Sequence, residues 1–138
     1  MESTIENRIQ VAIRIRPLLL EEVGHGNTKL RIDKKNSTII AFKEKLDVQK
    51  GFKFDIILDP LDGQADVFHK TKAHHILQRV LDGFNATIFA YGQTSTGKTY
   101  TMEGFNYIND MNGRPVPDTD DDSNIGISPR IIKRLFVS

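Results

Sequence analysis

The first sixty residues alternate between apolar and polar positions, which is the pattern of β-strands. Every second residue from Ile9 to Ile15 is apolar, and Pro17 ends this extended segment. Further extended segments are expected at 28–33, 37–45 and 50–60, with turn residues between the first two. The pattern predicts a strand followed by a small antiparallel flap.

The spacing of apolar residues changes at about residue 65. Apolar residues then recur every three or four positions as far as Phe84, which is typical of an amphipathic helix. Asp62 or Gln64 is the expected N-cap, and Asp82–Gly83 the expected end. The segment 86–92, with the sequence "ATIFAYG", predicts a buried strand in the middle of a parallel sheet.

The last third of the chain is polar before it becomes helical again. Asn, Asp, Pro and Gly dominate residues 105–126 and predict a long loop. Helical periodicity returns in "SPRIIKRLF", with Ser128 as the expected N-cap and Pro129 at the first helical position. No repeat or linker divides the chain, so we expect a leader at 1–8 and one folding region at 9–138.

Composition narrows the class of protein. The 138 residues include 19 basic and 18 acidic side chains, so the net charge of +1 gives no argument for a nucleic-acid or membrane partner. The absence of cysteine excludes disulfides and thiolate metal sites. No apolar run approaches the length of a signal peptide core or a membrane span, so we expect a soluble, cytoplasmic protein.

The most specific motif is "GQTSTGKT" at residues 92–99, which fits the phosphate-loop pattern. Its two glycines permit backbone angles that bring successive N–H groups round a phosphate, and the following helix adds N-terminal donors. Lys98 would contact the β and γ phosphates, and the Thr99 hydroxyl would ligate Mg²⁺. The candidate nucleotide-binding residues are Gly92, Gln93, Thr94, Ser95, Thr96, Gly97, Lys98 and Thr99.

The longer stretch "FAYGQTSTGKTYTMEG", residues 89–104, resembles the phosphate-loop signature of kinesin motor heads. Three further matches follow the family's order: "VAIRIRP" at 11–17, "FDIILDPLDGQADVF" at 54–68 and "GISPRIIKRLF" at 126–136. The resemblance implies an α/β fold of the P-loop NTPase type, with a mainly parallel central sheet, flanking helices and a small antiparallel flap. It also implies ATP and Mg²⁺ as cofactors, microtubules as the partner of the parent protein, and a place on the cytoskeleton.

The resemblance assigns further residues to the nucleotide. Arg14, Arg16 and Pro17 match the family's Arg-x-Arg-Pro motif, which borders the adenine. A planar guanidinium and a rigid ring suit a base, and Tyr100 could stack on its other side. The long polar loop matches the variable loop after the phosphate loop, which in spindle kinesins affects nucleotide turnover.

The sequence lacks the family's switch motifs, Asn-x-x-Ser-Ser-Arg-Ser-His and Asp-Leu-Ala-Gly-x-Glu. The segments that bind tubulin, the neck, and a late strand expected between "VAIRIRP" and "ATIFAYG" also have no match. We therefore expect the N-terminal part of a motor head, with no catalytic residue assigned and no ATP hydrolysis by this chain alone. The alternatives are a P-loop NTPase of another family and a truncated, non-catalytic fragment.

Two other groups of polar residues suggest metal sites but fit them poorly. His69, His74 and His75 lack the i, i+4 spacing that would clamp a metal from one helix face. The acidic run 118–124 resembles the opening of a calcium loop, but Ser123 stands at the glycine position and Pro129 at the glutamate position. Both groups are expected to be solvated or partly packed.

Overall fold

The computed structural model describes residues 9–23, 30–43, 48–105, 107–118 and 122–136. The leader expected at 1–8 lies outside this set. The chain divides into two compact units, Met1–Pro60 and Leu61–Ser138, and each is described below by itself.

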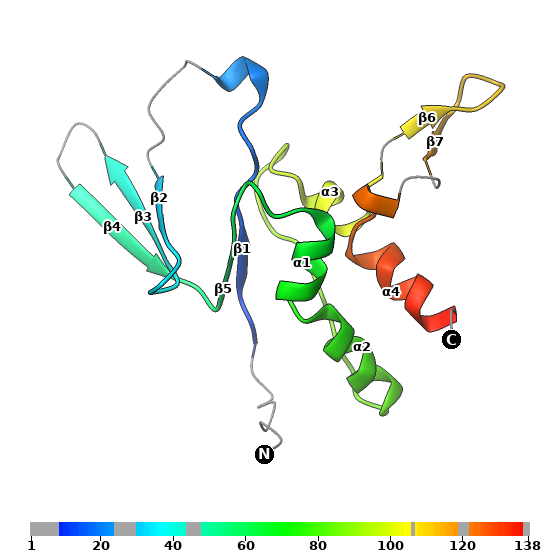
Figure 1. The fold of residues 1–138 in the computed structure, drawn as a ribbon, viewed down its shortest axis with the longest axis horizontal. Coiled ribbons are helices and arrows are strands. Elements are labelled where there is room, and N and C mark those ends of the chain that lie inside the picture. The colour runs from blue at the N-terminus through cyan, green and yellow to red at the C-terminus, as the bar shows by residue number, and fades with distance from the viewer. Residues whose placement is uncertain (1–8, 24–29, 44–47, 106, 119–121, 137–138) are drawn as a thin grey trace. The chain divides into compact units, whose positions relative to one another are not determined.

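The first unit consists of two small sheets (Figure 1). Its elements are β1 (Ala12–Arg14), the 3-10 turn η1 (Leu20–Glu22), β2 (Leu30–Asp33), β3 (Thr38–Lys43), β4 (Val48–Lys53) and β5 (Ile56–Leu58). β1 and β5 pair in parallel, with Ala12 opposite Ile56. β2, β3 and β4 form an antiparallel sheet, with Leu30 opposite Ala41. The small antiparallel flap expected from the alternation is therefore confirmed.

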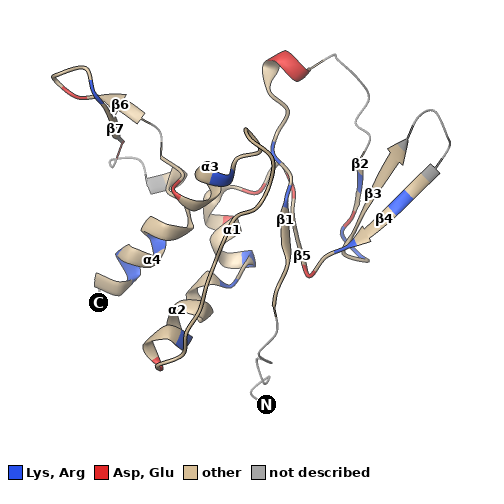
Figure 2. Cartoon of the chain, turned by 180° about the vertical axis from the view of Figure 1, so that it is seen from behind, with Lys and Arg blue, Asp and Glu red and all other residues tan. Residues whose placement is uncertain are grey.

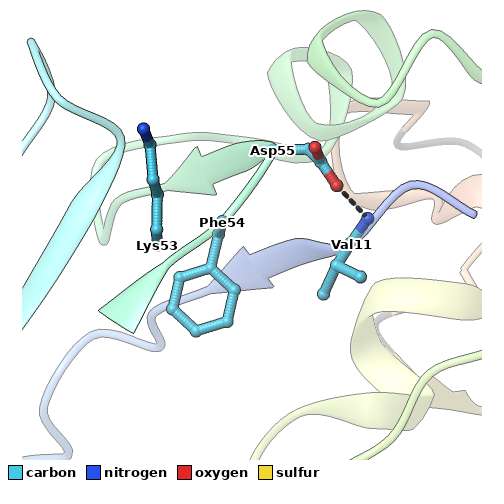
Figure 3. A pocket seen from close by; sticks show the side chains of 4 residues that line it. All are labelled: Val11, Lys53, Phe54 and Asp55. Atoms are coloured by element: carbon cyan, nitrogen blue, oxygen red, sulfur yellow. Dashed lines mark hydrogen bonds between the residues drawn. The ribbon is translucent and has the colours of Figure 1, made fainter. Parts of the chain in front are cut away.

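Side chains of the first unit hold the ends of the parallel pair. The Val11 N–H donates to a carboxylate oxygen of Asp55 over 2.9 Å, just before β5 (Figure 3). Val11, Lys53, Phe54 and Asp55 line a surface hollow at this point, and none of them is a candidate site residue. The buried Asp59, directly after β5, forms an ion pair with Lys34.

The second unit is helical, with one hairpin (Figure 1). Its elements are α1 (Gln64–Lys70), α2 (Ala73–Leu81), α3 (Lys98–Met102), β6 (Tyr107–Asn109), β7 (Pro115–Pro117), the 3-10 turn η2 (Asp122–Asn124) and α4 (Ile127–Phe136). α1, α2 and α4 contact one another, and α3 contacts α4. The buried apolar side chains that they share are Val67, Phe68, Ala73, Leu77, Ile125 and Ile127.

The single helix expected from residue 65 to 84 is wrong, because the structure has two helices there. Lys72 adopts a left-handed conformation, with a φ of 54°, which a continuous α-helix cannot contain. The Thr71 hydroxyl donates to the Val67 carbonyl over 2.7 Å and so takes up an acceptor at the end of α1. The change of direction allows buried residues of both helices to enter one core.

The helix ends follow glycines more closely than the sequence suggested. Gly63, rather than Asp62 or Gln64, is the N-cap of α1, and its N–H donates to the Asp66 carboxylate over 3.0 Å. The expected end at Asp82–Gly83 is confirmed, since Gly83 has a φ of 92°.

Ser128 is not the N-cap of the last helix, because α4 already begins at Ile127. The Gly126 carbonyl accepts the Arg130 N–H, and the Gly126 N–H donates to the Glu103 carbonyl over 2.7 Å. Backbone contacts at Gly126 therefore fix the start of the helix two residues ahead of the expected serine cap. Pro129 is accordingly the third residue of the helix rather than the first, as expected from the sequence, but it still lies in the first turn, where its missing N–H costs no hydrogen bond.

The strand expected at 86–92 is also wrong for the described structure, which assigns no strand to these residues. The segment leads from α2 to the phosphate loop with Ile88 and Ala90 half-buried, while Phe89 is 78% and Tyr91 95% exposed. The side chains of this segment still alternate between half-buried and exposed, as in a strand. However, no described strand pairs with the segment, and an extended segment is a β-strand only when its backbone is hydrogen-bonded to a neighbouring strand.

Gly104 is the position in the second unit at which a side chain would be least tolerated. Its φ is 76°, and an added Cβ would overlap the Asn124 carbonyl oxygen and the Gly126 nitrogen. Gly113 has a similar φ of 73°, but a Cβ there would meet no atom within 4 Å. A comparison of substitutions at the two glycines therefore distinguishes the cost of steric overlap from the cost of left-handed backbone strain.

We predict that Gly104→Ala lowers the free energy of unfolding by more than about 3 kcal/mol, because rigid backbone must move to admit the methyl group. Gly113→Ala, the matched control, should cost only the left-handed strain of about 1–2 kcal/mol. Urea unfolding followed by circular dichroism measures both. Equal losses in the two variants would contradict the close packing at Gly104.

Candidate functional site

The phosphate loop is a tight turn between the extended segment and α3. Ser95 has a φ of 65° and Gly97 a φ of 95°. Positive φ values in a short loop turn successive N–H groups toward one side, which makes a concavity for an anion. Thr96 stabilises the turn, since its N–H and its hydroxyl both donate to the Gln93 carbonyl, over 3.3 and 2.7 Å.

Gly92 is required by the packing inside the loop. A Cβ at this position would lie 2.7 Å from the Thr96 hydroxyl oxygen, closer than real side-chain contacts allow. That hydroxyl is the group that holds the loop together through Gln93. The first glycine of the motif is therefore explained by close approach, and the second, Gly97, by its left-handed backbone as the N-cap of α3.

The Lys98 ammonium lies against the backbone of its own loop. It donates to the Gly92 carbonyl over 2.9 Å and to the Gln93 carbonyl over 2.8 Å. An ammonium has three N–H groups. Figure 2 shows basic ribbon at the start of α3, and residues 92–99 contain no acidic side chain. The loop therefore carries a net positive charge close to its backbone N–H groups.

These features fit a bound phosphate group. The loop has a backbone with no side chain at its two tightest points, a cation fixed beside it, and no carboxylate of its own to repel an anion. Thr99 lies one residue after Lys98 in the first turn of α3, and its side chain is exposed. A hydroxyl in this position is suited to a metal ion bound beside the phosphates.

Tyr100 is tied to the rest of the second unit at both ends. Its hydroxyl donates to the Asn124 side-chain oxygen over 3.2 Å, and its carbonyl accepts from the Gln64 amide over 2.6 Å. The stacking of Tyr100 on a base stays a prediction. In the sequence Gln64 is marked only as a possible cap. No local signal indicates its place beside α3, because its partners lie 36 and 60 residues away.

Arg14, Arg16 and Pro17 belong to the first unit, where Arg16 is engaged by a carboxylate. Its guanidinium donates to both oxygens of Glu22, over 3.0 and 2.7 Å, and to the Pro17 carbonyl over 3.1 Å. The pKa of Glu22 lies below its ordinary value because it accepts these bonds and one from the Leu19 N–H. Arg16 therefore shapes the turn after Pro17, and adenine contact by these residues stays a prediction.

The three histidines and the acidic run at 118–124, which fit metal sites poorly in the sequence, show no metal-binding arrangement among the described residues. Burial, followed by the positive potential of His75, Arg134 and His69, holds the pKa of His74 below its ordinary value. Among the described residues no group of three or more potential ligands could hold a metal ion, and residues 119–121 of the acidic run lie outside them.

The comparison with protein families decides the family of the chain. A model of the kinesin motor domain matches residues 14–138. The chain belongs to the kinesin motor domain family. A solved structure described as that of a fast kinesin aligns with a TM-score of 0.74 and 32% identity, over 94% of this chain and 32% of the solved one. The P-loop NTPase fold of this family, expected from the sequence, is therefore confirmed.

Kinesins from plants and animals are similar to this kinesin chain. Kinesin-like protein KIN-14J of rice is 42% identical over 72% of the chain, and kinesin-like protein KIN-5A of Arabidopsis thaliana 37% identical over 93%. The human chromosome-associated kinesin KIF4B is 34% identical over 93%. The chain spans 12%, 12% and 9% of the length of these relatives. No helix among the described residues is long and apolar enough to cross a membrane.

Proposed function

We propose that this kinesin chain binds ATP with Mg²⁺ through residues 92–99, and that it is the nucleotide-binding part of a microtubule-based motor. The observation that carries the proposal is the Lys98 ammonium, fixed by the Gly92 and Gln93 carbonyls inside a loop free of acidic residues. Its charge would face the β and γ phosphates, which are the most highly charged part of ATP.

Different residues of the chain would contact the phosphates, the metal ion and the base. The backbone N–H groups near Ser95 and Gly97 would donate to phosphate oxygens. Thr99 would contribute its hydroxyl to the metal ion, and bound Mg²⁺ supplies charge neutralisation between the β and γ phosphates. In the first unit, Arg14 and Pro17 would lie beside the adenine, with Arg16 holding their turn through Glu22.

Microtubule movement is the proposed function of the parent protein rather than of these residues alone. Family membership supports it, and it implies a cytoplasmic location on the microtubule cytoskeleton. The sequence contains neither switch motif of the family, so no residue here is assigned to position the attacking water or to complete the metal shell. The chain is accordingly proposed as a binding unit and not as a complete ATPase.

We predict that Lys98→Ala weakens Mg·ATP binding by about 1.5–3 kcal/mol, because it removes a charged hydrogen bond to phosphate. Lys133→Ala removes the same charge from the exposed face of α4 and serves as the control. Isothermal titration calorimetry measures both affinities. Equal affinity for the wild-type chain and Lys98→Ala would contradict the assignment of the loop.

We predict that Arg14→Ala weakens Mg·ATP binding by about 1 kcal/mol, the size of a cation–π contact with the base. It should leave the affinity for Mg·tripolyphosphate unchanged, because that ligand has no base. Lys98→Ala should weaken both ligands, so competition titrations with the two ligands distinguish base contacts from phosphate contacts. A loss of tripolyphosphate affinity in Arg14→Ala would count against the adenine assignment.

We also predict that the 138-residue chain shows no microtubule-stimulated ATP turnover, since it holds neither switch motif. Phosphate release is followed with and without polymerised tubulin, and the same assay is repeated after a switch-containing kinesin sequence is appended. Turnover only in the extended protein is the expected result. Stimulated turnover in the 138-residue chain that disappears in Lys98→Ala would show that the switch motifs are dispensable.

A further inference from the structure

The helix that carries Lys98 and Thr99 has almost no apolar anchorage. α3 is five residues long, and none of its side chains is buried. A helix of this length has no stability of its own, because the cost of nucleation exceeds the gain from so few hydrogen bonds. The position of α3 must therefore be set by polar contacts with the rest of the second unit.

Two hydrogen bonds between described residues reach the backbone of α3 and of its C-cap. The Gln64 amide donates to the Tyr100 carbonyl over 2.6 Å, and the Gly126 N–H donates to the Glu103 carbonyl over 2.7 Å. The first contact reaches the residue directly after Thr99. The second contact lies beyond the last residue of α3 and joins its C-cap, Glu103, to the residue directly before α4. Gln64 therefore holds the part of α3 nearest the loop.

Gln64 is itself rigidly placed. It is the first residue of α1 and only 2% exposed, with the buried Val67 one turn further along the helix. Its amide also donates to the Asn124 carbonyl over 3.3 Å, and a Cβ at Gly104 would lie 2.6 Å from its nitrogen. One buried amide thus joins α1, α3 and η2. The space beside this amide admits glycine at position 104 but no residue with a side chain.

We propose that Gln64 is a positioning residue for nucleotide binding, which sets the distance of Lys98 and Thr99 from the phosphates and Mg²⁺ by holding the Tyr100 carbonyl. This inference rests on the proposed function of the loop. It goes beyond that function because Gln64 is a residue of α1, outside the loop at 92–99, and is proposed to act on binding through the backbone of α3. Its substitution should change the response to Mg²⁺ as well as stability.

The test compares Gln64→Met with Gln78→Met in the full 138-residue chain. Methionine keeps the length and helix propensity of glutamine but removes the amide donors, leaving the Tyr100 carbonyl without this partner. Gln78 lies exposed on α2 and donates to Asp82, so it controls for the substitution itself. Affinity for ADP is measured by calorimetry with Mg²⁺ and with EDTA, beside the urea midpoint of each protein.

In the wild-type chain, Mg²⁺ should strengthen ADP binding. Gln64→Met should lose about tenfold in Mg·ADP affinity, with a smaller gain from Mg²⁺, while Gln78→Met keeps wild-type values. An unchanged Mg²⁺ gain in folded Gln64→Met, with only the urea midpoint lowered, would overturn the inference by showing a merely structural role. Failure of the wild-type chain to bind Mg·ADP would overturn the proposed function itself.

Gln64→Glu provides a second, reversible test that holds even if Gln64→Met does not fold. A carboxylate would face two carbonyl oxygens, whereas its protonated form can donate to one of them, and burial raises the pKa of a carboxyl group. Mg·ADP affinity of Gln64→Glu relative to wild type should therefore rise severalfold from pH 8 to pH 5.5. A pH-independent ratio of the two affinities would refute the role of the donated hydrogen bond.

Discussion

The close approach of two backbone segments at Gly104 and Gly126 determines where the phosphate loop can lie. A side chain at either position would collide with backbone, at Asn124 in one case and at Met102 in the other. The Gly126 N–H is thereby brought to the Glu103 carbonyl, and α3 is joined to the start of α4. The C-terminal end of α3 is thus located by a hydrogen bond between backbones that almost touch, whereas the core beneath α1, α2 and α4 is held by apolar burial.

In each unit a polar side chain holds the segment that carries candidate site residues, but the two side chains differ in charge and burial. In the first, a guanidinium–carboxylate pair between Arg16 and Glu22 holds the turn that follows β1, with both partners partly exposed. An exposed pair of this kind contributes little to stability, but its two-point geometry fixes the orientation of the planar group. In the second, the buried Gln64 amide serves α3. Arg16 therefore belongs to the framework of its motif, while Arg14 and Pro17 are the residues proposed to meet the base.

Local patterns predicted the parts of the fold that depend on neighbouring residues. Alternation was sufficient for the antiparallel flap, and the phosphate-loop motif placed both essential glycines. The break at Lys72 was missed because the apolar spacing continues across it, and a left-handed lysine leaves no mark in composition. The strand expected at 86–92 failed for a different reason, since apolar character indicates burial but a ladder needs a partner strand. Gln64 was undervalued because its partners are distant in sequence.

Stability and site geometry are separable in this chain because they rest on different residues. α3 buries no side chain, so a small displacement of the helix removes little apolar surface from the core. The same displacement moves the Lys98 ammonium, because Lys98 is the first residue of α3. Its two acceptors, Gly92 and Gln93, belong to the loop that enters the helix. Electrostatic contact with a phosphate falls off with distance and depends on direction, so it responds to shifts that the core tolerates. Weakened polar contacts to α3 should therefore appear first as altered ligand binding, and thermal stability alone is a poor measure of the integrity of this site.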